Sequence, residues 1–173
     1  MTSITDIQPE QRVAIVTGGA RGIGAAITTA LARSGVHVAA GYSSNAKAAE
    51  ELAGKLGAEG ASVSVHQGNV GEPADCNRVD KTVRRMSVED WHAVLRINLS
   101  GAFYMTKAVL DHMTGRSFGR IVNISSVIGQ TGSVGQSNYA SSKAGLIGFS
   151  KSLAQEVARK GVTVNCVAPG YIE

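Results

Sequence analysis

Apolar and polar residues follow two patterns along the chain. Short apolar runs, which predict strands, alternate with apolar residues at helical spacing, which predict helices. Short runs of β-branched residues have the length and composition of buried strands, at residues 13–16, 36–40 and 62–65. Between them, apolar residues repeat at helical spacing at Ile23, Ile27 and Leu31, and again over residues 46–56 up to Gly57. This strand–helix alternation predicts a parallel sheet of the α/β class.

The second half of the chain continues the alternation with longer helices. Ser87 is followed three residues later by Asp90, the spacing of a capping box, and the apolar period after it runs to about Met113. Three further elements follow in order: a strand at residues 120–124, a helix at residues 138–160 closed by Gly161, and a strand at residues 162–167. Residues 129–137 are rich in Gly and Ser and predict a loop.

A glycine-rich turn connects the first predicted strand to the first predicted helix. It reads TGGARGIG from Thr17, with glycines at positions 18, 22 and 24 among others. Glycines let a backbone approach a pyrophosphate closely, and a helix N-terminus supplies N–H groups and positive potential. A glycine turn alone is weak evidence, but here it stands between a strand and a helix, as a nucleotide site requires. We therefore expect a dinucleotide-binding site.

The residues after the second predicted strand favour NADP over NAD. An acidic residue there would bind the ribose 2′-OH of NAD, but residues 41–45, which include Tyr42 and Ser43, hold no carboxylate. Arg21 in the glycine turn and Lys47 beyond the strand supply cations that suit a 2′-phosphate. The alternative, that both are ordinary solvated surface charges, stays open.

Tyr139 and Lys143 stand four residues apart in a predicted helix and therefore share one face. A phenol loses its proton near pH ~10, and an ammonium group alongside favours the phenolate and lowers that pKa. Ser126, at the end of the preceding strand, can hydrogen-bond the same reacting oxygen. Such a Tyr–Lys pair also occurs by chance in amphipathic helices, so the catalytic interpretation depends on the glycine turn before it.

Composition narrows the class of protein. The 173 residues predict one domain, their 43% hydrophobic content suffices for a core, and the charge of +4 forms no basic run of the kind that binds nucleic acid. Cys76 and Cys166 fit no metal-ligand spacing and predict reduced thiols in a cytoplasmic protein. The polar N-terminus predicts no signal peptide, and no apolar run is long enough to span a membrane.

Taken together, these motifs resemble the classical short-chain dehydrogenase/reductase family over nearly the whole chain. The matching residues are Thr17-Gly18-x-x-x-Gly22-x-Gly24, Asn98, Ser126, Tyr139-x-x-x-Lys143 and Pro169-Gly170. Ser126, rather than Ser125, matches through its thirteen-residue distance to Tyr139. The segments around Ser126 and Tyr139 are similar to bacterial 3-oxoacyl-ACP reductases and acetoacetyl-CoA reductases.

This resemblance implies a Rossmann-type fold: a doubly wound parallel sheet in three layers, α/β/α. It implies reduction of a 3-oxoacyl thioester, carried by ACP or CoA, to the 3-hydroxyacyl thioester with NADP(H) as cofactor, as in fatty acid biosynthesis. It also implies a homotetramer, joined partly by the helices near residues 88–113 and 138–160.

The resemblance also implies a role for each matching residue. Tyr139 would donate a proton to the carbonyl oxygen, Lys143 would lower the Tyr139 pKa and hold the nicotinamide ribose, and Ser126 would polarise the carbonyl. Asn98 would help hold a water in the proton relay. The implied cofactor-binding residues are Gly18, Arg21, Gly22, Ile23, Gly24, Tyr42, Ser43, Asn69, Val70, Tyr139, Lys143, Pro169, Gly170 and Ile172.

Two features depart from the family pattern. No Asn-Asn-Ala-Gly motif or fourth strand precedes the helix of Asn98, and the helix start predicted at Pro73 does not develop. The family would need on the order of twenty more residues there, since a βαβ crossover alone takes ~10–12. We therefore expect the single domain of residues 1–173 to be interrupted near residues 76–81, where residues of the family pattern are missing from this sequence. The last strand and the segment that covers the substrate are also missing after Glu173.

Three functional hypotheses follow. The leading one is an NADPH-dependent 3-oxoacyl-thioester reductase. The second, of a different class, is a catalytically silent nucleotide-binding fragment that keeps the glycine turn. The third is a reductase of another carbonyl, such as a steroid, sugar or small ketone.

Overall fold

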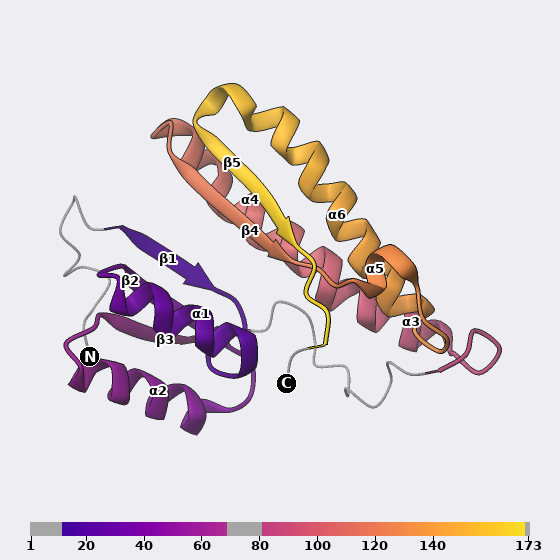
Figure 1. The fold of residues 1–173 in the computed structure, drawn as a ribbon, viewed down its shortest axis with the longest axis horizontal. Helices are drawn as coiled ribbons and strands as arrows, with labels where there is room; N and C mark the ends of the chain where they lie inside the picture. The colour runs from indigo at the N-terminus through magenta and orange to yellow at the C-terminus, as the bar shows by residue number, and fades with distance from the viewer. Residues whose placement is uncertain (1–11, 69–80, 172–173) are drawn as a thin grey trace. The chain divides into compact units, whose positions relative to one another are not determined.

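The computed structural model describes residues 12–68 and 81–171, which belong to two compact units (Figure 1). The first unit comprises residues 1–69 and the second residues 70–173. Each unit has its own parallel sheet, with order β1-β2-β3 in the first and β4-β5 in the second. Parallel strands joined by helices confirm the predicted Rossmann-type α/β class. None of the helices in the described ranges has the length and apolar character that a membrane crossing requires.

The first unit alternates strands and helices as the sequence predicts. Its elements are β1 (Val13–Val16), α1 (Gly22–Arg33), β2 (His37–Tyr42), α2 (Ala46–Ala58) and β3 (Val63–Gln67). In register, Val13 lies opposite His37, and Val38 lies opposite Val63. Since side chains alternate between the two faces of a strand, this register sends Ala14, Val16 and Val38 to one face of the sheet.

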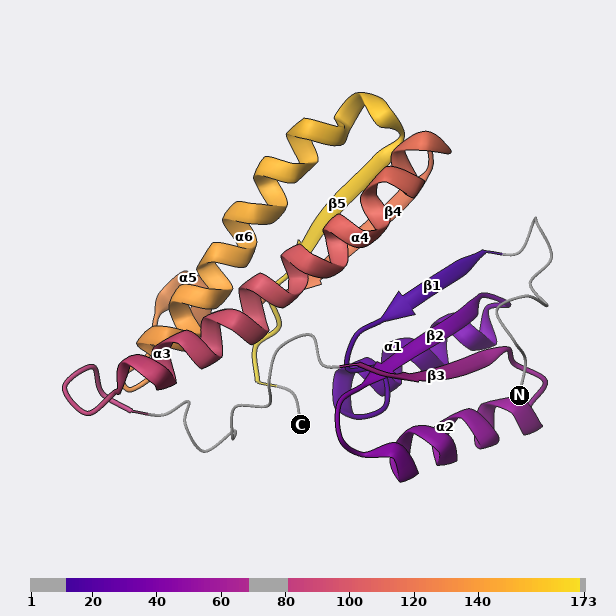
Figure 2. The ribbon, with the colours of Figure 1, turned by 180° about the vertical axis from the view of Figure 1, so that it is seen from behind.

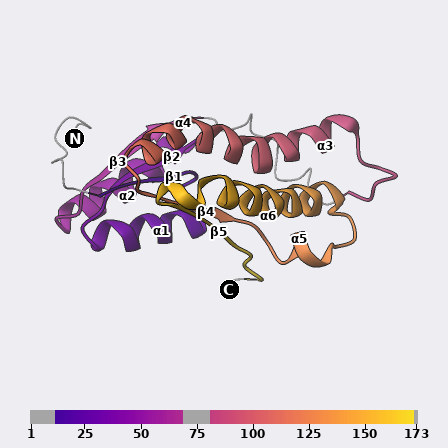
Figure 3. The same cartoon turned by 90° about the horizontal axis from the view of Figure 1, so that it is seen from above.

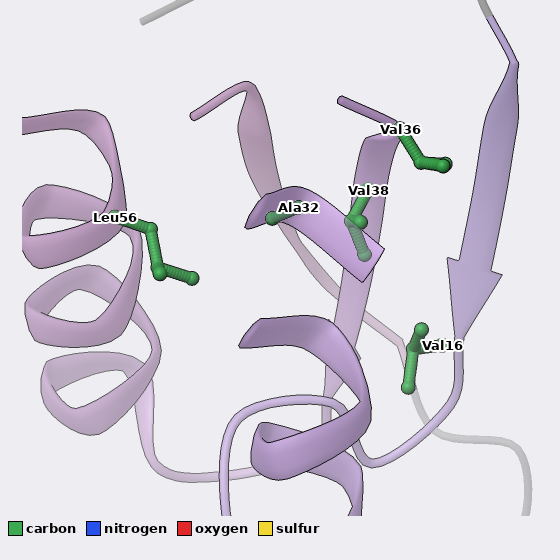
Figure 4. Packing of buried hydrophobic residues seen from close by; sticks show 5 residues of the cluster. All are labelled: Val16, Ala32, Val36, Val38 and Leu56. Carbon is green, nitrogen blue, oxygen red and sulfur yellow. The ribbon is translucent and has the colours of Figure 1, made fainter. Parts of the chain in front are cut away.

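The helices of the first unit cover that face. Val16, Ala32, Val36, Val38 and Leu56 form the core between the sheet and the helices (Figure 4). Fully burying a Val or Leu side chain contributes roughly 1.5–3 kcal/mol. Val13 and Ile15, which point to the opposite face, keep 52% and 53% of their surface exposed.

Two sequence-based details of the first unit were wrong. Gly57 lies inside α2 and does not end it; Gly60, with φ of 82°, follows the C-cap residue Glu59. A glycine costs about 1 kcal/mol in a helix, and the burial of Leu56 beside it outweighs that cost. Ile23, which the apolar period places on the core face of α1, is exposed at the first turn of the helix, while Ile27 and Leu31 do pack against the core.

The second unit consists of long helices packed on a two-stranded sheet. Its elements are α3 (Val88–Leu95), η3 (Arg96–Ser100), α4 (Gly101–Gly115), β4 (Gly119–Ile124), α5 (Ile128–Thr131), α6 (Ser137–Val157), η4 (Ala158–Lys160) and β5 (Val162–Val167). Figure 2 shows α4 and α6 in front of β4 and β5, which Figure 1 shows from the opposite side. Ile121, Leu153, Val157 and Val162 form the core beneath α6.

One long helix was predicted after Ser87, and the structure adds a π-helical segment to it. The predicted capping box is confirmed: the Ser87 side chain accepts from the Asp90 N–H, and the Asp90 carboxylate accepts from the Ser87 N–H. Between α3 and α4 lies η3, where the Gly101 N–H donates to the Arg96 carbonyl, five residues back. Figure 3 shows that the helix axis continues through this segment.

The loop after β4 and the end of α6 complete the second unit. A short helix, α5, overlaps the predicted loop at residues 129–131, so that part of the prediction was wrong. Gly161 takes the left-handed conformation, with φ of 69°, and ends the helix as predicted. A Cβ atom at Gly161 would lie 1.9 Å from the Ser117 carbonyl oxygen, so no other residue fits this turn.

Among the described strands, β1 pairs only with β2, and β4 pairs only with β5. In a doubly wound sheet a further strand is expected next to β1, in the middle of the sheet. The helix start predicted at Pro73 and the interruption predicted near residues 76–81 lie outside the described residues.

Candidate active-site residues in the two units

The glycine turn of the first unit has the backbone geometry that a phosphate-binding turn requires. Gly18 and Gly22 have φ of 64° and 51°, in the left-handed region that glycine adopts without strain. A Cβ at Gly24 would lie 2.1 Å from the Gly18 carbonyl oxygen, so α1 begins in direct backbone contact with the turn. The exposed Arg21 is the N-cap residue of α1 and has extended backbone.

Gly19, which the sequence reasoning did not single out, is the buried centre of this turn. Its N–H donates to the Gly41 carbonyl, 2.9 Å away, and its carbonyl accepts from the Thr28 hydroxyl at 3.0 Å. The turn is thus tied to the end of β2 and to the second turn of α1. The local sequence around Gly19 could not predict these hydrogen bonds, because both partners, Gly41 and Thr28, belong to other elements.

Tyr42 and Ser43 stand at the end of β2, next to β3. The Tyr42 carbonyl accepts from the Gly68 N–H at 2.9 Å, and the Ser43 carbonyl accepts from the Gln67 side chain at 3.2 Å. Lys47, on α2, lies 3.9 Å from the Glu51 carboxylate, and both side chains are well exposed. Two other predicted cofactor contacts, Asn69 and Val70, lie outside the described residues.

In the second unit, α6 brings Tyr139 and Lys143 together. The Lys143 Nζ atom lies 5.7 Å from the centre of the Tyr139 ring and donates to the Ile124 carbonyl at 2.8 Å. Burial lowers the pKa of Lys143, and the nearby Cys166 thiol acts in the opposite direction. Lys143 therefore loses its proton more readily than an exposed lysine does.

Ser125 and Ser126, at the end of β4, face different partners. The Ser126 Oγ atom accepts from the Ile128 N–H at 3.2 Å, where the chain enters α5. The buried Ser125 hydroxyl donates to the Lys143 carbonyl at 2.8 Å, and so joins the end of β4 to α6. Ser125 is thus a structural neighbour of the candidate site that the sequence reasoning left aside.

Asn98 lies within the π-helical segment η3. Its Nδ2 group donates to the Ser142 hydroxyl at 3.1 Å, and that hydroxyl donates to the Tyr139 carbonyl at 2.7 Å. Ser142 is fully buried. A π-helical turn leaves backbone groups out of the regular α-helical ladder, and such turns are frequent at functional sites. Asn98 thus makes a helix–helix contact that links η3 to the first turns of α6, as an ordinary buried Asn also would.

Pro169 and Gly170 follow β5 near the same residues. The Pro169 carbonyl accepts from the Val127 N–H at 3.0 Å, next to Ser126. Ile172 lies outside the described residues. In the parts of the chain that the structure describes, no three His, Cys, Asp or Glu side chains are grouped so as to hold a metal ion.

The family profile described as "short chain dehydrogenase" matches residues 12–86 and 78–173, nearly the whole chain. The chain belongs to the short-chain dehydrogenase family. Membership makes it an oxidoreductase and implies a nicotinamide dinucleotide as cofactor.

Relatives in this family have high sequence identity to the chain. Acetoacetyl-CoA reductase of Shinella zoogloeoides is 46% identical, with 93% of this chain and 74% of that protein aligned. The 3-oxoacyl-(acyl-carrier-protein) reductase of Synechocystis sp. is 40% identical over 99% and 76%. The 3-oxoacyl-(acyl-carrier-protein) reductase FabG of Escherichia coli is 41% identical over 95% and 75%.

The first alignment has more positions than the number of residues of this chain that it includes. The first spans 183 positions but takes in 93% of the 173 residues, which is about 161. About 22 positions of that relative therefore have no counterpart in the aligned part of this chain. The two segments matched by the family profile overlap at residues 78–86.

Proposed function

We propose that this chain is an NADPH-dependent reductase of 3-oxoacyl thioesters, carried by ACP or CoA, with the 3-hydroxyacyl thioester as product. The observation that carries the proposal is the arrangement on α6, where a half-buried lysine ammonium lies beside Tyr139. The named relatives act on such thioesters, and their high identity to this chain supports the same substrate class.

The glycine turn fits a dinucleotide. Its left-handed glycines and the contact of Gly24 with Gly18 leave the start of α1 open to a pyrophosphate, which Gly18, Gly22, Ile23 and Gly24 would hold through backbone groups. When bound, the nicotinamide ring supplies the hydride that reduces the carbonyl carbon. Asn69, Val70, Pro169, Gly170 and Ile172 complete the proposed cofactor set.

The residues of the second unit would handle the proton. Tyr139 would donate its phenolic proton to the substrate carbonyl oxygen, and Ser126 would hydrogen-bond the same oxygen and polarise it. The Lys143 ammonium would stabilise the phenolate that Tyr139 becomes, since a positive charge nearby favours the ionised form. Asn98, held by Ser142, would keep the π-helical turn in place for a water that passes the proton on.

NADP is proposed over NAD because residues 41–45, at and directly after the end of β2, hold no carboxylate. The exposed Arg21 is the N-cap residue of α1, and Lys47 makes a loose ion pair with Glu51, at 3.9 Å. A charge-assisted contact to the 2′-phosphate contributes roughly 1.5–3 kcal/mol. Arg21→Ala should therefore weaken NADPH use by about one to two decades in KM and leave NADH use unchanged. Equal use of both cofactors by the unaltered enzyme would contradict this assignment.

A homotetramer is proposed on the same resemblance. Phe103 and Tyr104, on α4, keep 44% and 58% of their surface exposed. The Phe103 ring also meets the Phe149 ring of α6 edge to face, at 6.3 Å between centres. Exposed aromatic side chains on α4 suit a protein–protein interface. Light scattering coupled to gel filtration measures the subunit number directly.

A second candidate function is that of a catalytically silent nucleotide-binding protein. It is favoured by the positions of the first relative that have no counterpart in this chain. A third is reduction of another carbonyl compound, such as a steroid, sugar or small ketone.

One assay distinguishes these candidates. The purified chain is mixed with NADPH and acetoacetyl-CoA, and loss of NADPH absorbance is followed, with cofactor binding measured in parallel. Turnover supports the thioester reductase. Binding without turnover on this substrate or on a panel of ketones and sugars supports the silent protein. Turnover only on another carbonyl supports the third candidate.

A further inference from the structure

A buried threonine holds the glycine turn of the first unit from behind. Thr28 lies on the second turn of α1, its side chain is 0% exposed, and its hydroxyl donates to the Gly19 carbonyl at 3.0 Å. The Gly19 N–H donates to the Gly41 carbonyl at the end of β2. Both backbone groups of Gly19 are therefore fixed by rigid elements, one by a helix and one by a strand.

Close packing adds to these hydrogen bonds. A Cβ atom at Gly19 would lie 2.8 Å from the Thr28 hydroxyl oxygen, 2.8 Å from the Val16 carbonyl oxygen and 3.0 Å from the Ala40 Cβ. A side chain at position 19 would therefore collide with α1 and with the sheet, so glycine is required there. Gly19 and Thr28 thus fit one another as a pair.

The hydrogen bond from Thr28 also sets the direction of the next N–H group. A trans peptide is planar, and its N–H points opposite to its carbonyl. Because the Gly19 carbonyl points to Thr28, the N–H of Ala20 points away from the core. Rotation of this one peptide would turn that donor inward.

We propose that Thr28 is a positioning residue for the pyrophosphate of a dinucleotide, an inference that rests on the proposed cofactor binding. Thr28 does not touch the ligand. It fixes the Gly19–Ala20 peptide and thereby keeps the turn in its binding conformation before the ligand arrives. Preorganisation of this kind increases affinity because less order is lost on binding.

The chemistry predicts a specific pattern. The pyrophosphate is common to NADPH and NADH, so loss of the Thr28 donor weakens both cofactors by the same factor. Loss of Arg21, by contrast, affects the cofactor with a 2′-phosphate. A net hydrogen bond is worth ~0.5–1.5 kcal/mol, which corresponds to a factor of about two to ten in Kd.

The test compares three variants of the whole chain. Thr28→Val keeps the branched shape and removes the donor, whereas Thr28→Ser keeps the hydroxyl. Thr29→Val is the matched control, because the Thr29 hydroxyl donates only within α1, to the Ala25 carbonyl at 2.8 Å. Dissociation constants of NADPH and NADH are measured by calorimetry, together with the melting temperature of each variant.

The expected result is an equal rise in both Kd values, by about two- to tenfold, for Thr28→Val alone. Thr28→Ser and Thr29→Val should bind both cofactors as the unaltered chain does. If Thr28→Val does not fold, Thr28→Ala removes the same donor with less strain, and failure of both to fold would assign Thr28 to stability and overturn the proposal.

The remaining outcomes separate this inference from the proposed function. Unchanged Kd values in Thr28→Val would overturn the role of Thr28 while leaving cofactor binding intact. An effect on NADPH alone would also overturn it. If the unaltered chain binds neither dinucleotide, the proposed function fails, and the role of Thr28 fails with it.

Discussion

Tyr139 is the residue whose chemistry is easiest to isolate by mutation. Removing its hydroxyl leaves the ring, the helix and the nearby Lys143 in place, because the Lys143 ammonium donates to the Ile124 carbonyl. Tyr139→Phe therefore removes a proton donor and little else. General acid catalysis contributes typically ~10²–10⁴-fold, so we expect kcat to fall by at least about a hundredfold while NADPH binding stays nearly unchanged. A variant that kept more than about a tenth of the kcat would contradict the assignment.

We expect His37 to make the stability of the first unit depend on pH. Its side chain is 1% exposed, its Nδ1 atom lies 2.6 Å from the Ser62 hydroxyl, and the Ser64 hydroxyl lies between its Nε2 atom and that of His66. Burial, and then the charge of His66, lower the pKa of His37. In the unfolded chain this pKa is about 6.5, so below that pH the unfolded state binds the proton first.

The contribution of neutral His37 to the free energy of unfolding should therefore be fully present above about pH 6.5 and be lost as the pH falls below that value. We expect the melting temperature of the unaltered chain to drop between about pH 7.5 and about pH 5.5, and His37→Gln to reduce that drop. His112→Gln, an exposed position on α4, serves as the control. An unchanged pH dependence in His37→Gln would show that other groups are responsible.

At the scale of elements, two matching links attach α6 to its neighbours. Asn98 of η3 donates to Ser142, which donates to the Tyr139 carbonyl. Asn123 of β4 donates to Ser150 at 2.9 Å, and Ser150 donates to the Leu146 carbonyl at 2.7 Å. The two links have the same chemistry, but only the first lies beside the candidate catalytic residues.

This pairing gives a controlled experiment. Asn98→Ala and Asn123→Ala each leave a buried serine without its donor, at a cost of about 1–3 kcal/mol, so both should lower the free energy of unfolding. Only Asn98→Ala should also lower kcat, measured with acetoacetyl-CoA at saturating NADPH. An equal loss of kcat in both variants would mean that Asn98 acts through stability alone.

Single elements were predictable to the extent that their signals are local. The capping box of Ser87 and the left-handed Gly161 depend on neighbouring residues, and both are confirmed. Two features were missed. One is the extra residue of η3, which leaves the apolar period almost unchanged. The other is the set of hydrogen bonds of Ser125 and Ser142, which join segments far apart in sequence. Neither feature has a signal in the local pattern. The spacing of Tyr139 and Lys143 predicted a shared face correctly, while their catalytic roles remain predictions.

At the scale of the whole molecule, the described strands form two sheets where the family pattern predicts one. Sequence periodicity identifies strands but not the strands with which they pair. A further strand between β1 and β4 would leave the apolar runs that predict these two strands unchanged. About 22 positions of the first relative have no counterpart in this chain. A crossover helix and a strand would add a similar number, roughly twenty residues.

We therefore predict that the natural protein carries additional residues near positions 76–81. Peptide mapping of the protein from its source, with two proteases of different specificity, tests this directly. Peptides with inserted sequence between Cys76 and Lys81 are the expected result. A single peptide that runs continuously through these residues would refute the interruption and favour the silent nucleotide-binding protein.

The π-helical segment has a consequence for how the chain tolerates changes in length. Each residue of an α-helix turns the chain by about 100°, so a deletion in an ordinary helix re-aims every later side chain. The wider turn at η3 already contains one residue more than an α-helical turn. Removal of one residue there would restore the α-helical ladder and keep Phe103 and Thr106 on their present faces. Helix α4 would thus keep its register if this one residue were lost, and the change would be felt at η3 itself, where Asn98 lies.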